Sequence, residues 1–543
     1  YPIYISSGDG YTGEFRITDN SGTGNTYNYI HMEGNLKGNV KLGTSNALEW
    51  VFQTGVQVSS GAVWELGADE VIKTDSYSDD IRVYGTLTVS TTADHPVVFT
   101  SLADNEYGYP IGSGTPAKGN WGGIYVSSTG TAVLDHAIIR YGGYSDSLPD
   151  ALVKVVEGGS LTLTNSILEH SAMYGVYVDG VETQAILNNT ISDCDSYGIY
   201  IYDSDTDALP TSPEIRGNVI NNCSYPIYIS SGDGYTGEFR ITDNSGTGNT
   251  YNYIYMEGDL KGSVKLGTSN ALEWVFQNGV TVSSGAVWEL GPDEVIKTDS
   301  PGDDINVYGT LVVSTTADHP VVFTSLADNE YGYPIGSGSP AKGDWNGIYV
   351  PEGGTAVLEH VIIRYGGYSN SLSNALVIVE EGGSLTLTDS ILEHSAGYGV
   401  YVKGIETQAI LNNTIRDCDQ AGIYFYEYDT DTLPLSPEIR GNVIDNCLYP
   451  ILISSDDGYT GEFRITDNSG VGNTYNYIRI YGVFKGSVKL GTSNGFDWVF
   501  GGINVTAGAV WELGPDEVIK IESGSGNIIV YGTLTVNTTA DHP

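Results

Sequence analysis

The amino-acid sequence predicts an all-β protein whose short strands form the coils of a parallel β-helix, a solenoid that continues through tandem repeats. Three observations support this prediction: a repeat of 224 residues, a shorter spacing of β-rich runs inside each repeat, and a composition rich in glycine and tyrosine. Glycine supplies 71 of the 543 residues, and 40 are tyrosine. Such a composition favours strands joined by tight turns over helices.

The long repeat can be read directly from the sequence. Residues 1–30 are identical to residues 225–254, and a diverged third copy begins at residue 449. A fixed period of this kind indicates an array and not a set of unrelated domains. The predicted segments are unit 1 at 1–224, unit 2 at 225–448 and a partial unit 3 at 449–543.

Within a unit, short apolar runs start 23 to 28 residues apart: GIYV at 123–126, ALVKV at 151–155, GVYV at 175–178, GIYI at 198–201 and PIYI at 226–229. Apolar residues alternate within a run, so we expect Ile199 and Ile201 to face the core and Tyr200 to face outward. Strands with this spacing fit coils in which each strand pairs with its counterpart one coil further on.

Longer phrases resemble a known family. GTLTVSTTADHPVVFTSLADNEYGYPIGSGTPAKGNWGGIYV at 85–126 and LDHAIIRYGG at 134–143 resemble repeats of right-handed parallel β-helices in secreted and surface proteins of the pectate-lyase-like superfamily. The phrases LTLTNSILEHSAMYGVYV and AILNNTISDCDSYGIYI have the same repeat style. The resemblance implies a right-handed β-helix over nearly the whole chain. It selects no activity, because the superfamily includes lyases, hydrolases, adhesins and fibre proteins.

The charge narrows the classes of partner. With 23 Lys and Arg against 67 Asp and Glu, the formal net charge is −44. Binding to nucleic acid or to an acidic membrane surface is therefore electrostatically unfavourable. No segment approaches the roughly 18 consecutive apolar residues of a membrane span. We expect an acidic, extracellular or cell-surface protein.

Acidic loops are the best candidates for a ligand site. Asp203, Asp205 and Asp207 alternate in IYDSDTDALP, and unit 2 carries Glu427, Asp429 and Asp431 at the equivalent positions. Clustered carboxylates with loop carbonyls bind the hard ion Ca²⁺, although none of these loops has EF-hand spacing. Solvated turn acids that keep the protein soluble explain the same residues. Further acidic turns hold Asp75, Asp79 and Asp80, with Asp299, Asp303 and Asp304 as partners, and Asp104 and Glu106, with Asp328 and Glu330 as partners.

Aligned phrases predict columns of like residues along the solenoid. One column contains His136, Asn165, Asn189 and Asn218, and in unit 2 His360, Asp389, Asn413 and Asn442. We expect a ladder of hydrogen bonds at a repeated turn there. A second column contains Tyr141, His170, Cys194 and Cys223, with His394, Cys418 and Cys447 in unit 2. Small buried residues, a zinc site and a disulfide between neighbouring cysteines all fit it.

An outward column is rich in tyrosine. It contains Tyr125, Lys154, Tyr177, Tyr200, Tyr228 and Tyr253, and the equivalent residues 224 positions further on are Tyr349, Ile378, Tyr401, Tyr424, Leu452 and Tyr477. Stacked tyrosines could bind glycans or form a packing face. The replacements by Lys, Ile and Leu favour packing, because like residues stack well on a sheet face.

The sequence favours a structural role over catalysis. It contains no Ser/His/Asp constellation, phosphate loop or HExxH motif. The phrase ADHP pairs Asp94 with His95, and we expect a turn there. We predict a non-enzymatic structural protein that forms a stiff β-helical fibre, filament or stalk, with no catalytic residue and no cofactor other than calcium.

Self-association, end to end or laterally, is the expected partnership. Both ends of the sequence fall inside a coil, so we expect a window on a longer array or units that stack end to end. One alternative is an adhesin that binds surface glycans through the tyrosine face. The other is a carbohydrate-active enzyme, either a polysaccharide lyase or a glycoside hydrolase.

Overall fold

Short parallel strands make up the regular structure of this chain. The structure is a computed structural model, and it describes residues 1–543 except 43–45, 79, 145–149, 181–183, 204–213, 267–269, 369–373, 405–407, 428–437, 456, 492, 523, 525 and 543. The described residues form strands, turns and bends, and no helix occurs among them. Within those ranges, accordingly, nothing could cross a membrane as a helix.

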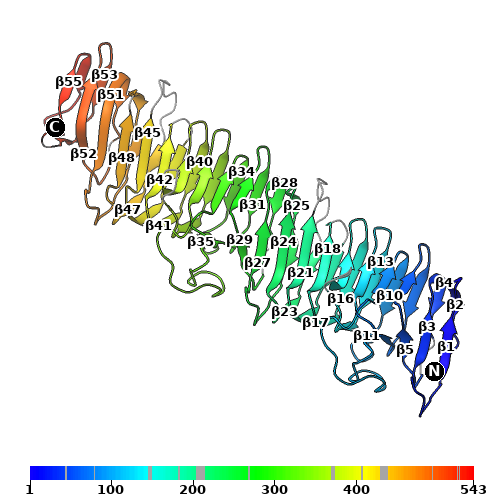
Figure 1. The fold of residues 1–543 in the computed structure, drawn as a ribbon. Coiled ribbons are helices and arrows are strands. Elements are labelled where there is room, and N and C mark those ends of the chain that lie inside the picture. Colours follow the sequence, from blue (N-terminus) through cyan, green and yellow to red (C-terminus); the bar gives the residue numbers. More distant parts are fainter. Residues whose placement is uncertain are drawn as a thin grey trace. The chain divides into compact units, whose positions relative to one another are not determined.

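The chain forms two compact structural units, whose bounds differ from those of the predicted sequence repeats; below, the first unit and the second unit are these structural units. The first contains Tyr1–Met256 and Leu266–Leu272, and the second contains Glu257–Lys265 and Glu273–Pro543. Inside a unit, each coil contributes one strand to each of three ladders, and each strand pairs in parallel with the equivalent strand of the next coil (Figure 1). This confirms the parallel β-helix expected from the spacing of the apolar runs. The repeat boundaries at residues 224 and 448 stay a prediction.

Three ladders run through the first unit. The first ladder contains β1 (Ile3–Ser6), β3 (Ile30–Glu33), β5 (Trp50–Phe52), β8 (Val71–Thr74), β11 (Val97–Ser101), β14 (Ala137–Arg140), β17 (Ile167–Ser171), β20 (Thr190–Cys194) and β23 (Val219–Asn221). The second ladder contains β6 (Val56–Val58), β9 (Asp80–Val83), β12 (Gly123–Val126), β15 (Ala151–Val155), β18 (Tyr174–Asp179), β21 (Tyr197–Asp203), β24 (Tyr225–Ser231) and β27 (Ile254–Glu257). The third ladder contains β2 (Tyr11–Glu14), β4 (Leu36–Lys41), β7 (Val63–Leu66), β10 (Thr86–Ser90), β13 (Thr131–Asp135), β16 (Ser160–Thr164), β19 (Gln184–Leu187), β22 (Glu214–Arg216) and β26 (Arg240–Thr242). The remaining strand is β25 (Tyr235–Glu238).

The second unit has the same plan. Its first ladder contains β29 (Trp274–Phe276), β32 (Val295–Thr298), β35 (Val321–Ser325), β38 (Val361–Arg364), β41 (Ile391–Ser395), β44 (Thr414–Cys418) and β47 (Val443–Asp445). Its second ladder contains β30 (Val280–Val282), β33 (Asp304–Val307), β36 (Gly347–Val350), β39 (Ala375–Val379), β42 (Tyr398–Lys403), β45 (Ile423–Glu427) and β48 (Ile451–Ser455). Its third ladder contains β28 (Leu260–Lys265), β31 (Val287–Leu290), β34 (Thr310–Ser314), β37 (Thr355–Glu359), β40 (Ser384–Thr388), β43 (Gln408–Leu411), β46 (Glu438–Arg440) and β50 (Arg464–Thr466). The last strands are β49 (Tyr459–Glu462), β51 (Ile478–Lys489), β52 (Trp498–Val505), β53 (Val510–Leu513), β54 (Ile519–Ile521), β55 (Ile528–Val530) and β56 (Thr533–Val536).

Aliphatic side chains stack level upon level in the core. The pairing register of the second ladder sets five fully buried residues over one another: Ile124, Val153, Val176, Ile199 and Ile227. Each such burial contributes about 1.5–3 kcal/mol. The alternation inferred from the sequence is confirmed, because Tyr200 lies between the buried Ile199 and Ile201 and stays partly exposed.

Each coil has a sharp corner between its third-ladder and first-ladder strands. His136, Asn165 and Asn188 occupy this corner with left-handed φ angles of 58°, 50° and 56°. Asparagine tolerates this backbone region better than most residues. The expected column that joined His136 and Asn165 to Asn189 is therefore wrong by one position. The register aligns the corner residues with Asn188, and it places Ser166 beside Asn189.

A ladder of buried amides follows the corner. Asn189 Nδ2 donates to Asn218 Oδ1 at 3.0 Å, and Asn218 Nδ2 donates to Asn244 Oδ1 at 3.0 Å. The second hydrogen of each amide goes to a backbone carbonyl, at Leu163 and Ile186 respectively. The predicted turn ladder is confirmed for Asn189 and Asn218. The second unit has the same ladder at Asn413, Asn442 and Asn468.

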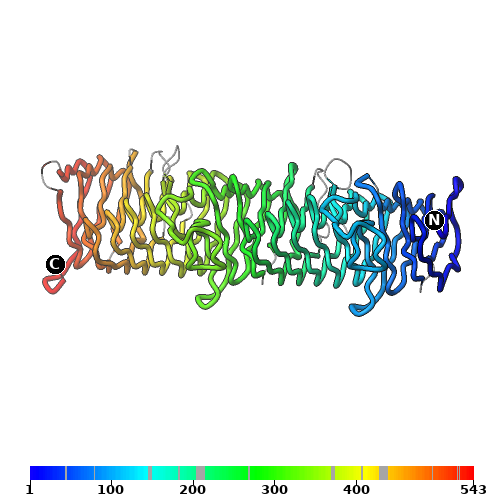
Figure 2. The backbone as a smooth tube through the Cα atoms, turned by 60° about the horizontal axis from the view of Figure 1, so that its bottom comes forward, coloured from blue at the N-terminus to red at the C-terminus, as the bar shows by residue number. Residues whose placement is uncertain are grey.

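Among the described residues, a long loop projects from each unit. It joins β11 to β12 in the first unit and β35 to β36 in the second, and both loops stand out from the coils in Figure 2. These loops carry Asp104 and Glu106 in the first unit and Asp328 and Glu330 in the second.

Candidate functional site

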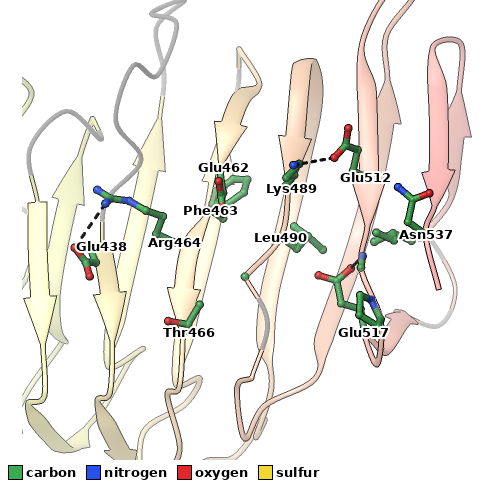
Figure 3. A pocket seen from close by; sticks show the side chains of 14 residues that line it. Glu438, Glu462, Phe463, Arg464, Thr466, Lys489, Leu490, Glu512, Glu517 and Asn537 are labelled. Atoms are coloured by element: carbon green, nitrogen blue, oxygen red, sulfur yellow. Dashed lines mark hydrogen bonds and ion pairs between the residues drawn. The ribbon is translucent and has the colours of Figure 1, made fainter. Parts of the chain in front are cut away.

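An open groove lies on the third-ladder side of the second unit (Figure 3). Its volume is about 490 Å³. The strand register places Glu462, Lys489 and Glu512 at successive levels, and Lys489 Nζ lies 3.0 Å from Glu512 Oε2. Glu438 and Arg464 border the same groove, 3.7 Å apart. Most of its charged side chains thus pair across neighbouring strands.

The first unit has an equivalent groove of about 500 Å³. Lys41 and Glu65 form an ion pair there, next to Glu14 in the register of β2 and β4. Glu70 also lines the groove, and its Oε2 accepts a hydrogen bond from the Gly67 N–H at 3.2 Å. Sequence reasoning missed both grooves, because they form only where charged residues from separate coils meet.

Burial gives Glu70 an unusual protonation state. Its side chain is buried, and the loss of hydration raises its pKa to about 8, with only the Gly67 N–H opposing this shift. Glu294 in the second unit behaves in the same way, also with a pKa of about 8. A carboxyl that stays protonated at neutral pH can donate a proton. The sequence signal is an acid directly before an apolar strand, in GADEVI and GPDEVI.

The acidic residues of the long loop pair with a buried arginine. Arg140 lies at the end of β14, and its guanidinium is 2.7 Å from Glu106, 3.1 Å from Glu169 and 3.7 Å from Asp104. Arg364 has the equivalent partners in the second unit, where Glu330 lies 2.7 Å away. Hence Asp104 and Glu106, considered as ligand candidates from the sequence, bind the loop to the coils.

Two lysines hold the loop as well. Lys73 is fully buried and donates to the Asp104 carbonyl at 2.6 Å. Lys118 Nζ lies 2.7 Å from both Asp193 and Asp195, two coils away. His170 joins this group, because its Nδ1 lies 2.5 Å from Asp193 Oδ2.

The remaining acidic turn differs between the units. Asp80 is buried and lies 2.9 Å from Arg82. In the second unit, Asp303 accepts hydrogen bonds from the backbone of Asp299 and Ser300. Burial, together with the neighbouring Asp299, raises the pKa of Asp303 to about 7. Asp79 lies outside the described residues.

The calcium candidates fall largely outside the part of the chain that the structure describes. Four of these candidates lie outside the described residues: Asp205, Asp207, Asp429 and Asp431. Asp203 and Glu427 end β21 and β45, but their side chains are outside the described part too. Among the described residues, no group of three or more His, Cys, Asp or Glu side chains is arranged to hold a metal ion.

The structure corrects the predicted column of histidine and cysteine. The register of β17 and β20 pairs Ser171, not His170, with Cys194. His170 has a left-handed φ of 59° and lies against Asp193 and the Tyr141 ring. Since the histidine belongs to a different column, a His–Cys–Cys zinc site at this position is excluded. The cysteines are buried free thiols.

The outward tyrosines stack on one another. The Tyr177 and Tyr200 rings are 5.0 Å apart and within 10° of parallel, and Tyr228 stacks on Tyr255 at 4.3 Å. Tyr253 was expected as the last member of this column, but Tyr255 stacks on Tyr228 in its place, so that part of the prediction is wrong. In the second unit, Leu452 pairs with Arg479, where Tyr477 was expected. Ring faces are thus largely occupied by other rings.

The ADHP phrase forms a turn, as expected. The His95 N–H donates to the Thr92 carbonyl at 3.0 Å. The imidazole pairs with Asp69, at 3.0 Å, and not with its sequence neighbour Asp94. Both side chains of the pair are well exposed.

Comparison with known proteins identifies the family. The chain matches the family model described as "Right handed beta helix region" over residues 115–285 and 339–495, more than half of its length. This protein therefore belongs to the right-handed β-helix family. No curated protein matches the chain. The family includes enzymes and non-enzymes, so membership assigns no activity.

Proposed function

We propose that this protein is a non-enzymatic, extracellular structural protein whose β-helical coils form a stiff fibre or a surface stalk. The observation that carries the proposal is the recurrence of the same coil-joining cluster in each unit. Lys118 binds Asp193 and Asp195 in the first, and Lys342 binds Asp417 and Asp419 in the second. In an enzyme, such polar groups would point at a substrate. In this protein, they connect one coil to another.

The mechanism is mechanical. Backbone hydrogen bonds between coils run along each ladder, and a stacked aliphatic core fills the interior, so bending a unit would disturb many contacts at once. Self-association, end to end or laterally, would extend the fibre. The net charge of −44 keeps such fibres dispersed in solution.

Electron microscopy of the native source tests this proposal. We expect filaments several times longer than one chain, with a regular axial period. Short, discrete particles would contradict a fibre. Immunolabelling of intact cells tests the surface location, and label found only after cell lysis would count against it.

Calcium binding at the loop after β21, through Asp203, Asp205 and Asp207, remains part of the proposal. Carboxylates separated by one residue can share one ion with loop carbonyls. Thermal unfolding with a chelator and with added calcium tests it. An unchanged midpoint would remove calcium from the proposal and leave the structural role untouched.

The grooves support a second candidate function, that of a carbohydrate-active enzyme. Glu70 combines a pKa of about 8 with a position on a groove that also holds Glu65, and glycoside hydrolysis uses a pair of carboxyl groups. Incubation with neutral polysaccharides tests this candidate. Hydrolysis that is abolished by E70Q would replace the structural proposal.

Glycan adhesion finds less support. A sugar binds an aromatic residue across the open ring face, and the stacked tyrosines cover those faces. Glycan-array binding that is lost in the Tyr177→Ala, Tyr200→Ala double variant would favour adhesion.

A further inference from the structure

Two cysteines lie on adjacent coils at the end of the first ladder in the first unit. Cys194 is the last residue of β20, and Cys223 lies two residues beyond β23. The register pairs Ile191 with Ile220 and Ser192 with Asn221. Continued by two residues, this register sets Cys194 directly opposite Cys223, with both side chains on the buried side.

The second unit repeats the arrangement. Cys418 ends β44, Cys447 lies two residues beyond β47, and the register pairs Ile415 with Ile444. Both thiols are buried. Neighbouring strands lie about 4.8 Å apart, which is inside the Cα separation that a disulfide permits.

The first cysteine of each pair lies beside a glycine in a closely packed interior. A methyl group at Gly175 would lie 2.6 Å from the Gly198 carbonyl oxygen and 3.3 Å from Cys194 Sγ, so the space there admits no larger residue. Gly399 lies beside Cys418 in the same way, at 3.4 Å from its sulfur. The Cys223 backbone N–H donates to Asn249 Oδ1 at 2.9 Å, which fixes the second cysteine.

The two thiols differ in acidity. The neighbouring Cys194 thiol favours the Cys223 thiolate, which lowers the pKa of Cys223 and raises that of Cys194. In the structure, Cys194 Sγ donates to the Ser192 carbonyl at 3.8 Å and Cys223 Sγ donates to the Asn221 carbonyl at 3.4 Å. Burial and the charge of Asp193 oppose this lowering of the Cys223 pKa, whereas the charge of Lys118, which Asp193 and Asp195 hold nearby, favours it. Cys223 is therefore the better nucleophile of the pair.

We propose that each pair is a dithiol–disulfide site, in which Cys194 bonds to Cys223 and Cys418 bonds to Cys447 after reaction with a small-molecule disulfide such as oxidised glutathione. The Cys223 thiolate attacks one sulfur of the reagent, which forms a mixed disulfide and releases one equivalent of thiolate. The Cys194 thiol then loses its proton and attacks the Cys223 sulfur. The protein disulfide forms, the second thiolate leaves, and the reagent has taken up the two electrons.

The new bond would join two neighbouring coils covalently. It would close a loop of one whole coil, which restricts the unfolded chain and favours the folded state. We expect the oxidised protein to unfold at a temperature several degrees higher than the reduced protein.

Thiol titration and peptide mapping test the proposal. The reduced full chain is incubated with oxidised glutathione, quenched with acid, denatured and titrated without reductant. We expect the four free thiols to disappear, and non-reducing peptide mapping to join Cys194 to Cys223 and Cys418 to Cys447. The proposal would be overturned if all four thiols remained free both in buffer and in urea too dilute to unfold the chain. It would also be overturned if a cysteine of one pair were joined to a cysteine of the other pair.

Single variants test the order of attack. In C194S we expect glutathione to stay attached to Cys223, because no second thiol can release it. In C223S we expect much slower modification of Cys194. The double variant C418S, C447S retains only the first pair and serves as the control for independence. Glutathione found equally on Cys194 and Cys223 in the two single variants would overturn the assigned roles.

Discussion

Asn189 donates its side-chain amide to Asn218 Oδ1, at 3.0 Å, from one coil to the next. Asn218 in turn uses both amide hydrogens, so its side chain joins three consecutive coils. We expect Asn218→Ala to destabilise the protein by about 2–3 kcal/mol, because it leaves buried donors and acceptors without partners. Chemical denaturation followed by circular dichroism measures the effect.

Thr190→Ala is a matched control for this change, since Thr190 is exposed on the adjacent strand β20. It should shift the midpoint only slightly. Equal shifts in the two variants would show that the amide ladder does not stabilise the fold.

Arg140 is expected to hold the long loop in place. Replacing it with glutamine leaves Asp104 and Glu169 without their buried cation, a loss of about 3–5 kcal/mol for a broken buried pair. We expect R140Q to be cut rapidly between β11 and β12 in limited proteolysis. Arg16→Gln, at an exposed ion pair, is the control and should be cut at the wild-type rate. Cleavage of R140Q at the same slow rate would contradict this role.

Glu294 makes stability depend on pH. Its folded-state pKa of about 8 lies above the ordinary value of 4.5, so the fold favours the protonated form. The stabilisation is complete below about pH 4, is lost as the pH rises toward 8, and stays lost above that. Since glutamine stays neutral, E294Q should be more stable than wild type at pH 9 by on the order of 4 kcal/mol, and similar to it at pH 4.

Denaturation midpoints at the two pH values measure this difference. Glu289→Gln is the control, because Glu289 is a half-exposed partner of Lys265. A difference between E294Q and wild type that does not change with pH would refute the raised pKa.

Tyr200 contributes to stability through its ring. We expect Tyr200→Ala to lower the free energy of unfolding by about 1–2 kcal/mol, because the stacked face of Tyr177 loses its partner. Tyr200→Phe keeps the ring and should retain most of that energy. If both variants lost the same amount, the hydroxyl and not the stacking would be responsible.

The coil architecture could be predicted from the sequence, whereas the registers at its corners could not. Runs such as GIYV at 123–126 and ALVKV at 151–155 coincide with β12 and β15, since alternation and spacing are local properties. The predicted columns of aligned residues were wrong where the turns between strands differ in length. Ser171 displaces His170 opposite Cys194, and Tyr255 displaces Tyr253, each by a shift of one or two residues.

The clusters were harder still to predict. Arg140 lies over 30 residues from Asp104, and nothing in either local sequence signals the other. Glu70 carried a weak signal, but its raised pKa depends on the depth of burial, which only the packed coils determine.

The nearest-neighbour character of the ladders has an evolutionary consequence. Within a unit, a strand pairs with the coil before it and the coil after it, so the loss or gain of whole coils leaves all other pairings intact. Genes that encode near-identical stretches recombine readily. Unequal crossing-over between such stretches would lengthen or shorten the protein by whole coils, and the remaining coils would keep their pairing partners.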